Sequence, residues 1–142
     1  MAKRFLTGLG IVLLLVGLVG AFTGGHDHEL IVFGINATHN MVHIVSGLLL
    51  IAFAWGGERS ARLGCRLFFA VYGLVTLGGF FGIESIVSGL NINPADNFLH
   101  LAIILGCAWH GFFRPTPIVP SGPYRSASSS RDRESLEIGS PR

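Results

Sequence analysis

Charge is scarce in this sequence. Only 13% of its 142 residues are Asp, Glu, Lys or Arg, and 50% are hydrophobic. Soluble domains carry about 25% charged residues, so this composition argues against an ordinary soluble domain. The net charge is only +2, and no basic stripe with interleaved aromatic residues is present. That absence argues against a nucleic-acid partner.

Cysteines and catalytic motifs are scarce too. Cys65 and Cys107 form no C-x-x-C pattern and no metal-ligand spacing, which argues against a disulfide framework. We expect both to fill helix contacts as small, packable residues. The sequence contains no G-x-S-x-G, no H-E-x-x-H and no glycine-rich phosphate loop. Because these are common signatures of hydrolytic and phosphate-binding sites, we predict that the protein is not an enzyme.

Long apolar runs are abundant. A helix needs about 20 residues to cross the hydrocarbon core of a bilayer. The runs, two of them extended by their polar N-terminal turns, predict four membrane spans at about residues 5–22, 38–56, 65–83 and 97–113. We interpret the first as a retained span, because it is long for a signal peptide and lacks a clear cleavage site. The predicted fold is an all-α, polytopic membrane four-helix bundle over residues 1–114.

The basic residues predict the orientation of these spans. Lys and Arg precede the first span, lie between the second and third, and follow the fourth, whereas residues 24–37 and 84–96 contain none. We predict that the protein lies in the inner membrane of the cell. The positive-inside rule then predicts that both termini are in the cytoplasm. Residues 115–142 are rich in Pro, Ser and Arg, and such a composition predicts a disordered cytoplasmic tail.

Two segments repeat each other. Residues 36–43 and 93–100 both read N-x-x-[H/D]-N-x-x-H, and residues 15–22 and 74–81 both read L-V-x-L-x-G-x-F. We interpret the bundle as two tandem helical hairpins of the same orientation, related by an axis along the membrane normal.

These motifs resemble those of a family of small bacterial four-span membrane proteins, known as domain of unknown function 4383. The resemblance rests on H-N-x-x-H at His39, Asn40 and His43, on N-x-x-D-N-x-L-H from Asn93 to His100, and on the glycine-rich spans between them. It covers roughly Leu9 to Phe113 and leaves out the tail. It implies a four-helix membrane fold and no particular activity.

Part of each polar motif has a structural explanation. Asn36 and Asn93 are expected to cap the helices that they begin, and Asp96 suits the positive N-terminal end of its helix. His43 and His100 lie about 10 Å deeper, at a rise of 1.5 Å per residue. Polar side chains at that depth usually face the bundle interior and find partners there.

Three interpretations of the deeper residues remain open. In the first, side chains hydrogen-bond across helices and fix the packing; these are Asn40, Asn97, His43 and His100. In the second, a zinc, copper or iron ion is bound by His39, His43, Asp96 and His100. In the third, His43 and His100 are axial ligands of a haem or related tetrapyrrole.

The functional prediction follows from these alternatives. We predict a small non-enzymatic membrane protein that serves as a structural or accessory module, as a homo-oligomer or as a subunit of a larger membrane complex. A metal- or haem-binding membrane protein is the alternative. An oligomeric transporter is a weaker alternative: the repeat is typical of transporters, but no charged residue lies in the middle of a span.

Overall fold

The computed structural model describes residues 1–23, 28–30 and 32–113, and the predicted disordered tail at 115–142 lies outside them. The elements, in chain order, are α1 (Ala2–Thr23), β1 (His28–Leu30), β2 (Phe33–Ile35), α2 (Ala37–Trp55), α3 (Gly57–Phe80), α4 (Glu84–Leu90), α5 (Pro94–Ala108) and the π-helical turn η1 (Trp109–Phe113). The two strands, of three residues each, form one short antiparallel hairpin. All other described elements are helical, so the predicted all-α class is confirmed.

Three of the described helices, α1, α2 and α3, are long and apolar enough to cross a membrane. The α5 helix has 15 residues, and η1 continues it without a break up to Phe113. Together α5 and η1 cover the region of the predicted fourth span. Apolar helices of this length indicate a membrane protein in contact with lipid.

The third helix begins well before the predicted span at 65–83. Only Gly56 separates α2 from α3, and Gly57 has a φ of 92°. That left-handed conformation is readily adopted by glycine, which permits the tight turn. Arg59, Arg62 and Arg66 therefore lie within α3 rather than in a loop. At the other end α3 stops at Phe80, and the expected loop at 84–96 contains the α4 helix.

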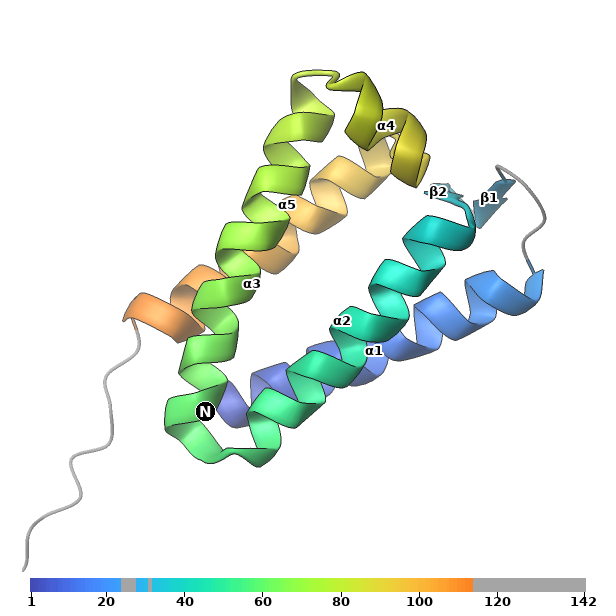
Figure 1. Cartoon of the computed structure of the whole chain (residues 1–142). Coiled ribbons are helices and arrows are strands. Elements are labelled where there is room, and N and C mark those ends of the chain that lie inside the picture. The colour runs from blue at the N-terminus through green and yellow to red at the C-terminus, as the bar shows by residue number, and fades with distance from the viewer. Residues whose placement is uncertain (24–27, 31, 114–142) are drawn as a thin grey trace, which may run out of the picture.

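The helices form two hairpins. In Figure 1, α1 and α2 lie side by side, as do α3 and α5, and these pairs have the most extensive contacts in the fold. The hairpins meet where α2 turns into α3, close to the N-terminus, and again at the other end, where α4 lies beside β2. The core contains both free cysteines, Cys65 and Cys107, fully buried.

At the end of the hairpins far from the N-terminus, asparagines tie the two hairpins together. Asn36, which begins α2, donates from Nδ2 to the carbonyl of Gly89 in α4, with a distance of 3.2 Å. Asn93, which begins α5, donates from Nδ2 to the carbonyl of Val32 in the β-hairpin, at 2.8 Å. Each capping asparagine therefore contacts the segment that connects the helices of the other hairpin.

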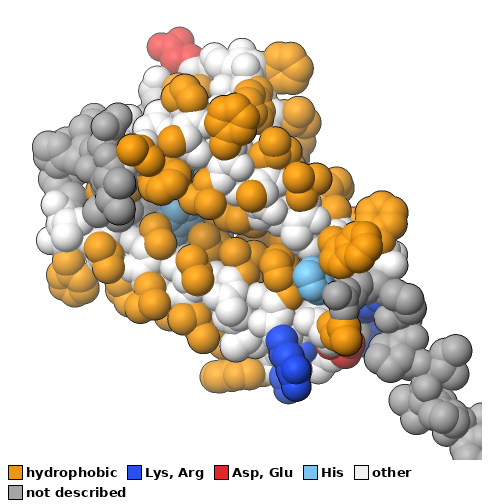
Figure 2. Space-filling view, turned by 180° about the vertical axis from the view of Figure 1, so that it is seen from behind, with side chains coloured by type: hydrophobic (Ala, Val, Ile, Leu, Met, Phe, Trp, Pro, Cys, Tyr) orange, Lys and Arg blue, Asp and Glu red, His pale blue; other side chains and the backbone are white. Residues whose placement is uncertain are grey.

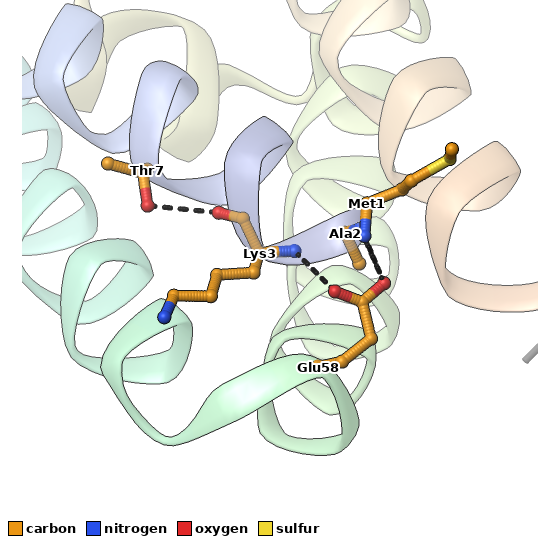
Figure 3. Close-up of polar contacts among 5 residues, drawn as sticks. All are labelled: Met1, Ala2, Lys3, Thr7 and Glu58. Atoms are coloured by element: carbon orange, nitrogen blue, oxygen red, sulfur yellow. Dashed lines mark hydrogen bonds and ion pairs between the residues drawn. The ribbon is translucent and has the colours of Figure 1, made fainter. Parts of the chain in front are cut away.

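At the end near the N-terminus, Glu58 of α3 holds the start of α1. Its carboxylate lies 2.6 Å from the Met1 ammonium group and accepts hydrogen bonds from the backbone N–H groups of Ala2 and Lys3, at 2.7 and 3.3 Å (Figure 3). First-turn N–H groups have no partner within their own helix. Glu58 thus caps α1 from the other hairpin.

The outer surface is largely apolar. Figure 2 shows hydrophobic side chains spread over one face, with the Lys and Arg side chains gathered at one end of it. Exposed apolar residues of this kind occur on α1, α2, α3 and α5. A surface so rich in exposed apolar groups fits a lipid environment and not water.

Candidate metal centre

Three imidazoles meet in the interior between the hairpins. His39 and His43 lie one turn apart on α2, and His100 lies on α5. One ring nitrogen from each falls within 4.8 Å of those from the other two. The side chains are 2%, 5% and 3% exposed, in that order. The ring centroids are 4.5 Å apart for His39 and His43, 5.9 Å for His39 and His100, and 6.3 Å for His43 and His100.

Local sequence signals place these side chains. The Asn36 side chain accepts a hydrogen bond of 2.8 Å from the N–H of His39, so it caps α2. Asn93 and Asp96 form a reciprocal capping box at the start of α5, with Pro94 in its first turn. Both asparagines hold the capping positions that the motif predicts. Each cap fixes where its helix begins, and thereby the depth of the histidines that follow.

Asn40 and Asn97 occupy equivalent places in the two hairpins. Each packs against a glycine of the neighbouring helix: the Asn40 amide against Gly20 of α1, and the Asn97 amide against Gly79 of α3. In both cases a side chain on the glycine would collide with Oδ1 of the asparagine. That oxygen has no hydrogen-bond partner in either residue. The two amides therefore pack tightly, and their oxygens make none of the hydrogen bonds that the first interpretation expects.

The imidazoles also retain buried atoms without partners. Both ring nitrogens of His39, Nδ1 of His43 and Nδ1 of His100 make no hydrogen bond. The backbone of Gly34 and Leu90 lies near the His39 ring, without the geometry of a hydrogen bond. A buried polar atom left unpaired costs about 1–3 kcal/mol. Hydrogen bonds across helices thus do not explain the cluster, whereas a bound ion would take one nitrogen from each of the three imidazoles.

Asp96 lies outside the three-histidine group. Its Oδ2 accepts hydrogen bonds from the N–H of Asn93, at 2.9 Å, and from the N–H of Gly34 in β2, at 3.0 Å. The side chain is 2% exposed and interacts electrostatically with His39. Three of the four predicted ligands therefore come together, and the fourth is a buried carboxylate beside them.

A cavity of about 50 Å³ adjoins the histidines. Its other walls come from α2, α3 and the end of α4, and consist of Val42, Ser46, Val71, Tyr72, Val75 and Leu90. Figure 2 shows histidine set back below the apolar surface on the side facing the viewer. Sequence reasoning missed Ser46 and Tyr72, whose only signal was a hydroxyl group within an otherwise apolar run.

Tyr72 contributes a second polar group to this cavity. Its side chain is 3% exposed, and its ring meets that of His100 edge-on, with centroids 5.4 Å apart and planes at 87°. The hydroxyl group faces Ser46 but makes no hydrogen bond of good geometry. Buried tyrosine hydroxyls usually have a partner, so this one is a second indication that a ligand belongs in the cavity.

The arrangement fits a metal ion better than a haem. With metal–nitrogen bonds of 2.0–2.1 Å and tetrahedral geometry, three imidazole centroids lie about 5 Å apart. The observed separations of 4.5, 5.9 and 6.3 Å surround that value. Binding pockets for larger organic ligands are typically about 300–1,000 Å³, so the cavity is too small for a porphyrin. Imidazole ligands without thiolates suit zinc and copper.

Comparisons with known proteins identify a family but no activity. No curated protein and no solved structure matches the chain. The family described as domain of unknown function (DUF4383) matches residues 3–113. This region includes all the described helices, from the first turn of α1 to the end of η1, and the three histidines. The chain therefore belongs to the DUF4383 family.

Proposed function

We propose that this protein binds one zinc or copper ion within the membrane, and that His39, His43 and His100 are its ligands. One observation carries the proposal: three buried imidazoles present nitrogens within 4.8 Å of one another, and each has a nitrogen without a hydrogen-bond partner. Metal-binding histidines are neutral, so the ligands add no charge to the apolar interior. The proposed role is binding and not catalysis.

The proposal includes a topology. The α5 helix with η1 is the fourth span, and the two hairpins are tandem copies related by an axis along the membrane normal. The end that carries Lys3, Arg4 and Arg59 faces the cytoplasm of a bacterium, according to the positive-inside rule. The histidines lie near the N-terminal ends of α2 and α5, away from that basic end, which supports a position for the ion in the outer half of the inner membrane.

A second candidate is a purely structural or accessory module. The observation that favours it is the contact between an asparagine amide and a glycine in both hairpins, Asn40 with Gly20 and Asn97 with Gly79. Close approach to small residues stabilises helix packing in membranes without any metal. In this alternative the histidines only complete the packing, and assembly with other membrane proteins would provide the function.

Elemental analysis of the detergent-purified protein separates the two candidates. We expect near-stoichiometric zinc or copper in the wild type, and its loss in the variant His43→Ala/His100→Ala. The control is His110→Ala, because His110 stacks on Phe5 at 4.2 Å and contacts the carbonyl of Gly106, away from the cluster. Absence of metal from the wild type, even after incubation with zinc and with copper, would leave the structural module as the better account.

A further inference from the structure

The three-histidine centre leaves one coordination position of the ion without a protein ligand. Zinc sites that close on themselves use four protein ligands, whereas sites that bind an exogenous ligand use three. Among the described residues, the group contains three ligand atoms and no cysteine or carboxylate. Asp96, the nearest acidic candidate in the sequence motif, directs Oδ2 to the backbone of Gly34 and Asn93. The remaining ligand has to come from the adjoining cavity.

Charge indicates what kind of ligand that is. A divalent ion with three neutral imidazoles carries two positive charges into an apolar interior, where an uncompensated charge is costly. The buried carboxylate of Asp96, which interacts with His39, offsets one of them. None of the residues that line the cavity is acidic. A single negative charge on the fourth ligand would balance the site.

The cavity is equipped to hold such an anion. The Tyr72 hydroxyl is buried, lacks a hydrogen-bond partner and lines the same cavity as the three histidines. A phenol is a good donor to an anion, and such charge-assisted bonds are stronger than neutral ones. Ser46, which lines the cavity beside it, offers a second hydroxyl group.

Size restricts the anion further. The cavity measures about 50 Å³, and a cavity needs about 10–15 Å³ on this scale to hold one water molecule. A ligand of a few heavy atoms fits, whereas an organic acid of several carbons does not. Val42 and Val71, which are 38% and 57% exposed, border the cavity. Access for a small ligand is therefore between α2 and α3.

We propose that the ion at His39, His43 and His100 binds a small monoanion, hydroxide or a species of similar size, in its fourth position, and that Tyr72 holds this anion by donating a hydrogen bond. This inference rests on the proposed metal-binding function. It assigns to Tyr72 a role that is distinct from packing against His100.

Azide is a suitable probe, because it is a monoanion of three atoms. The full chain in detergent is loaded with Cu²⁺ or Co²⁺ and titrated with azide, and binding is followed by the change in the metal's absorption spectrum. We expect saturable azide binding in the wild type. In Tyr72→Phe we expect unchanged metal content and azide binding weakened by about ten- to a hundredfold, the equivalent of one hydrogen bond to a charged group.

Thr76→Val is the matched control. Thr76 lies one turn further along α3, is 2% exposed and donates its hydroxyl to the carbonyl of Tyr72, at 2.7 Å. It does not line the cavity, so losing this hydroxyl should leave azide binding unchanged. Equal weakening in both variants would overturn the role given to Tyr72, since it would reflect a general disturbance of α3.

The remaining outcomes separate this inference from the proposal on which it rests. If the wild type binds neither Cu²⁺ nor Co²⁺, the proposed function itself fails. If metal binds but azide leaves its spectrum unchanged, the metal centre stands and the open fourth position is wrong. If Tyr72→Phe loses the metal, Tyr72 is a ligand of the ion and not a donor to an anion.

Discussion

The two hairpins of this protein use the same polar scaffold and differ at one position of it. Both have a capping asparagine, a deeper asparagine packed against a glycine, and a histidine below that. Between the two asparagines, α2 has His39 and α5 has Asp96. The N-terminal hairpin therefore contributes two imidazoles to the cluster, and the C-terminal hairpin contributes one imidazole and a carboxylate. A single difference is enough to make a three-histidine group from a near-symmetric framework.

The physical reason lies in what each side chain does in the first turn of its helix. Asp96 completes the capping box of α5 and also accepts the N–H of Gly34, so it links the C-terminal hairpin to the β-hairpin of the other. The start of α2 has no carboxylate, and its cap rests on Asn36 alone. His39 is therefore available to bind an ion. The C-terminal hairpin thus has the carboxylate that links the two hairpins, and the N-terminal hairpin has two of the three proposed ligands.

The largest effect on metal affinity is expected when the motif at 36–43 is made to match the motif at 93–100. His39→Asp removes one of the three imidazoles and adds a carboxylate close to Asp96. Loss of a residue that hydrogen-bonds to a metal ligand typically weakens metal affinity about 10–100-fold. Loss of one of the three imidazole ligands should therefore weaken it by more than about 100-fold. Competition with a chelator measures the change. His110→Asp is the control, and similar weakening there would show that the effect is not specific to the cluster.

Removing the carboxylate of the second motif should have a smaller effect on the metal and a clear effect on stability. Asp96→Asn is expected to weaken metal affinity by about 10–100-fold, as a change beside the ligands does. It also weakens hydrogen bonds to Gly34 and Asn93, which should lower the free energy of unfolding by about 1–3 kcal/mol.

The matched variant for Asp96 is Asn36→Ala, which removes the other cap without removing charge. It should lower the free energy of unfolding by about 1 kcal/mol and weaken metal affinity less than Asp96→Asn does, because the charge beside the histidines stays. Denaturant unfolding in detergent micelles and chelator competition provide both readouts. If Asn36→Ala weakened metal binding as much as Asp96→Asn, the charge of Asp96 would not be the reason for its effect on metal affinity.

The contact between a glycine and an asparagine amide occurs once in each hairpin, and the two contacts should be equally sensitive to substitution of the glycine. Gly20→Ala and Gly79→Ala each place a methyl group against an asparagine amide, and overpacking of this kind costs about 1–3 kcal/mol of stability. Gly8→Ala and Gly73→Ala are the controls, because nothing lies within 4 Å of the added carbon. In these helical positions alanine should stabilise the protein by up to about 1 kcal/mol. A cost confined to one hairpin would contradict the equivalence of the two contacts.

The features that could be predicted from the sequence are those set by neighbouring residues in the chain, such as the helix caps. The caps at Asn36 and Asn93 follow from side-chain types and spacing. The repeat of the motif allowed His43 and His100 to face each other but did not require it. The apolar run at 65–83 does not reveal where α3 begins, because charged residues such as Arg59 continue the helix toward its N-terminus. Tyr72 and the bond between Asp96 and Gly34 depend on packing between segments that are distant in sequence.

The smallest effect is expected at the opposite end, where Glu58 joins the hairpins. The carboxylate is 33% exposed and pairs with a Met1 ammonium that is 76% exposed (Figure 3), and exposed pairs contribute about 0.2–1 kcal/mol. Glu58→Gln should lower stability by that amount at low salt, with the difference shrinking as ionic strength screens the pair. Glu84→Gln, an exposed first-turn acid of α4, is the control. Metal affinity should not change in either variant, because the centre lies at the other end of the hairpins. A change of metal affinity in Glu58→Gln would show that the two ends are coupled.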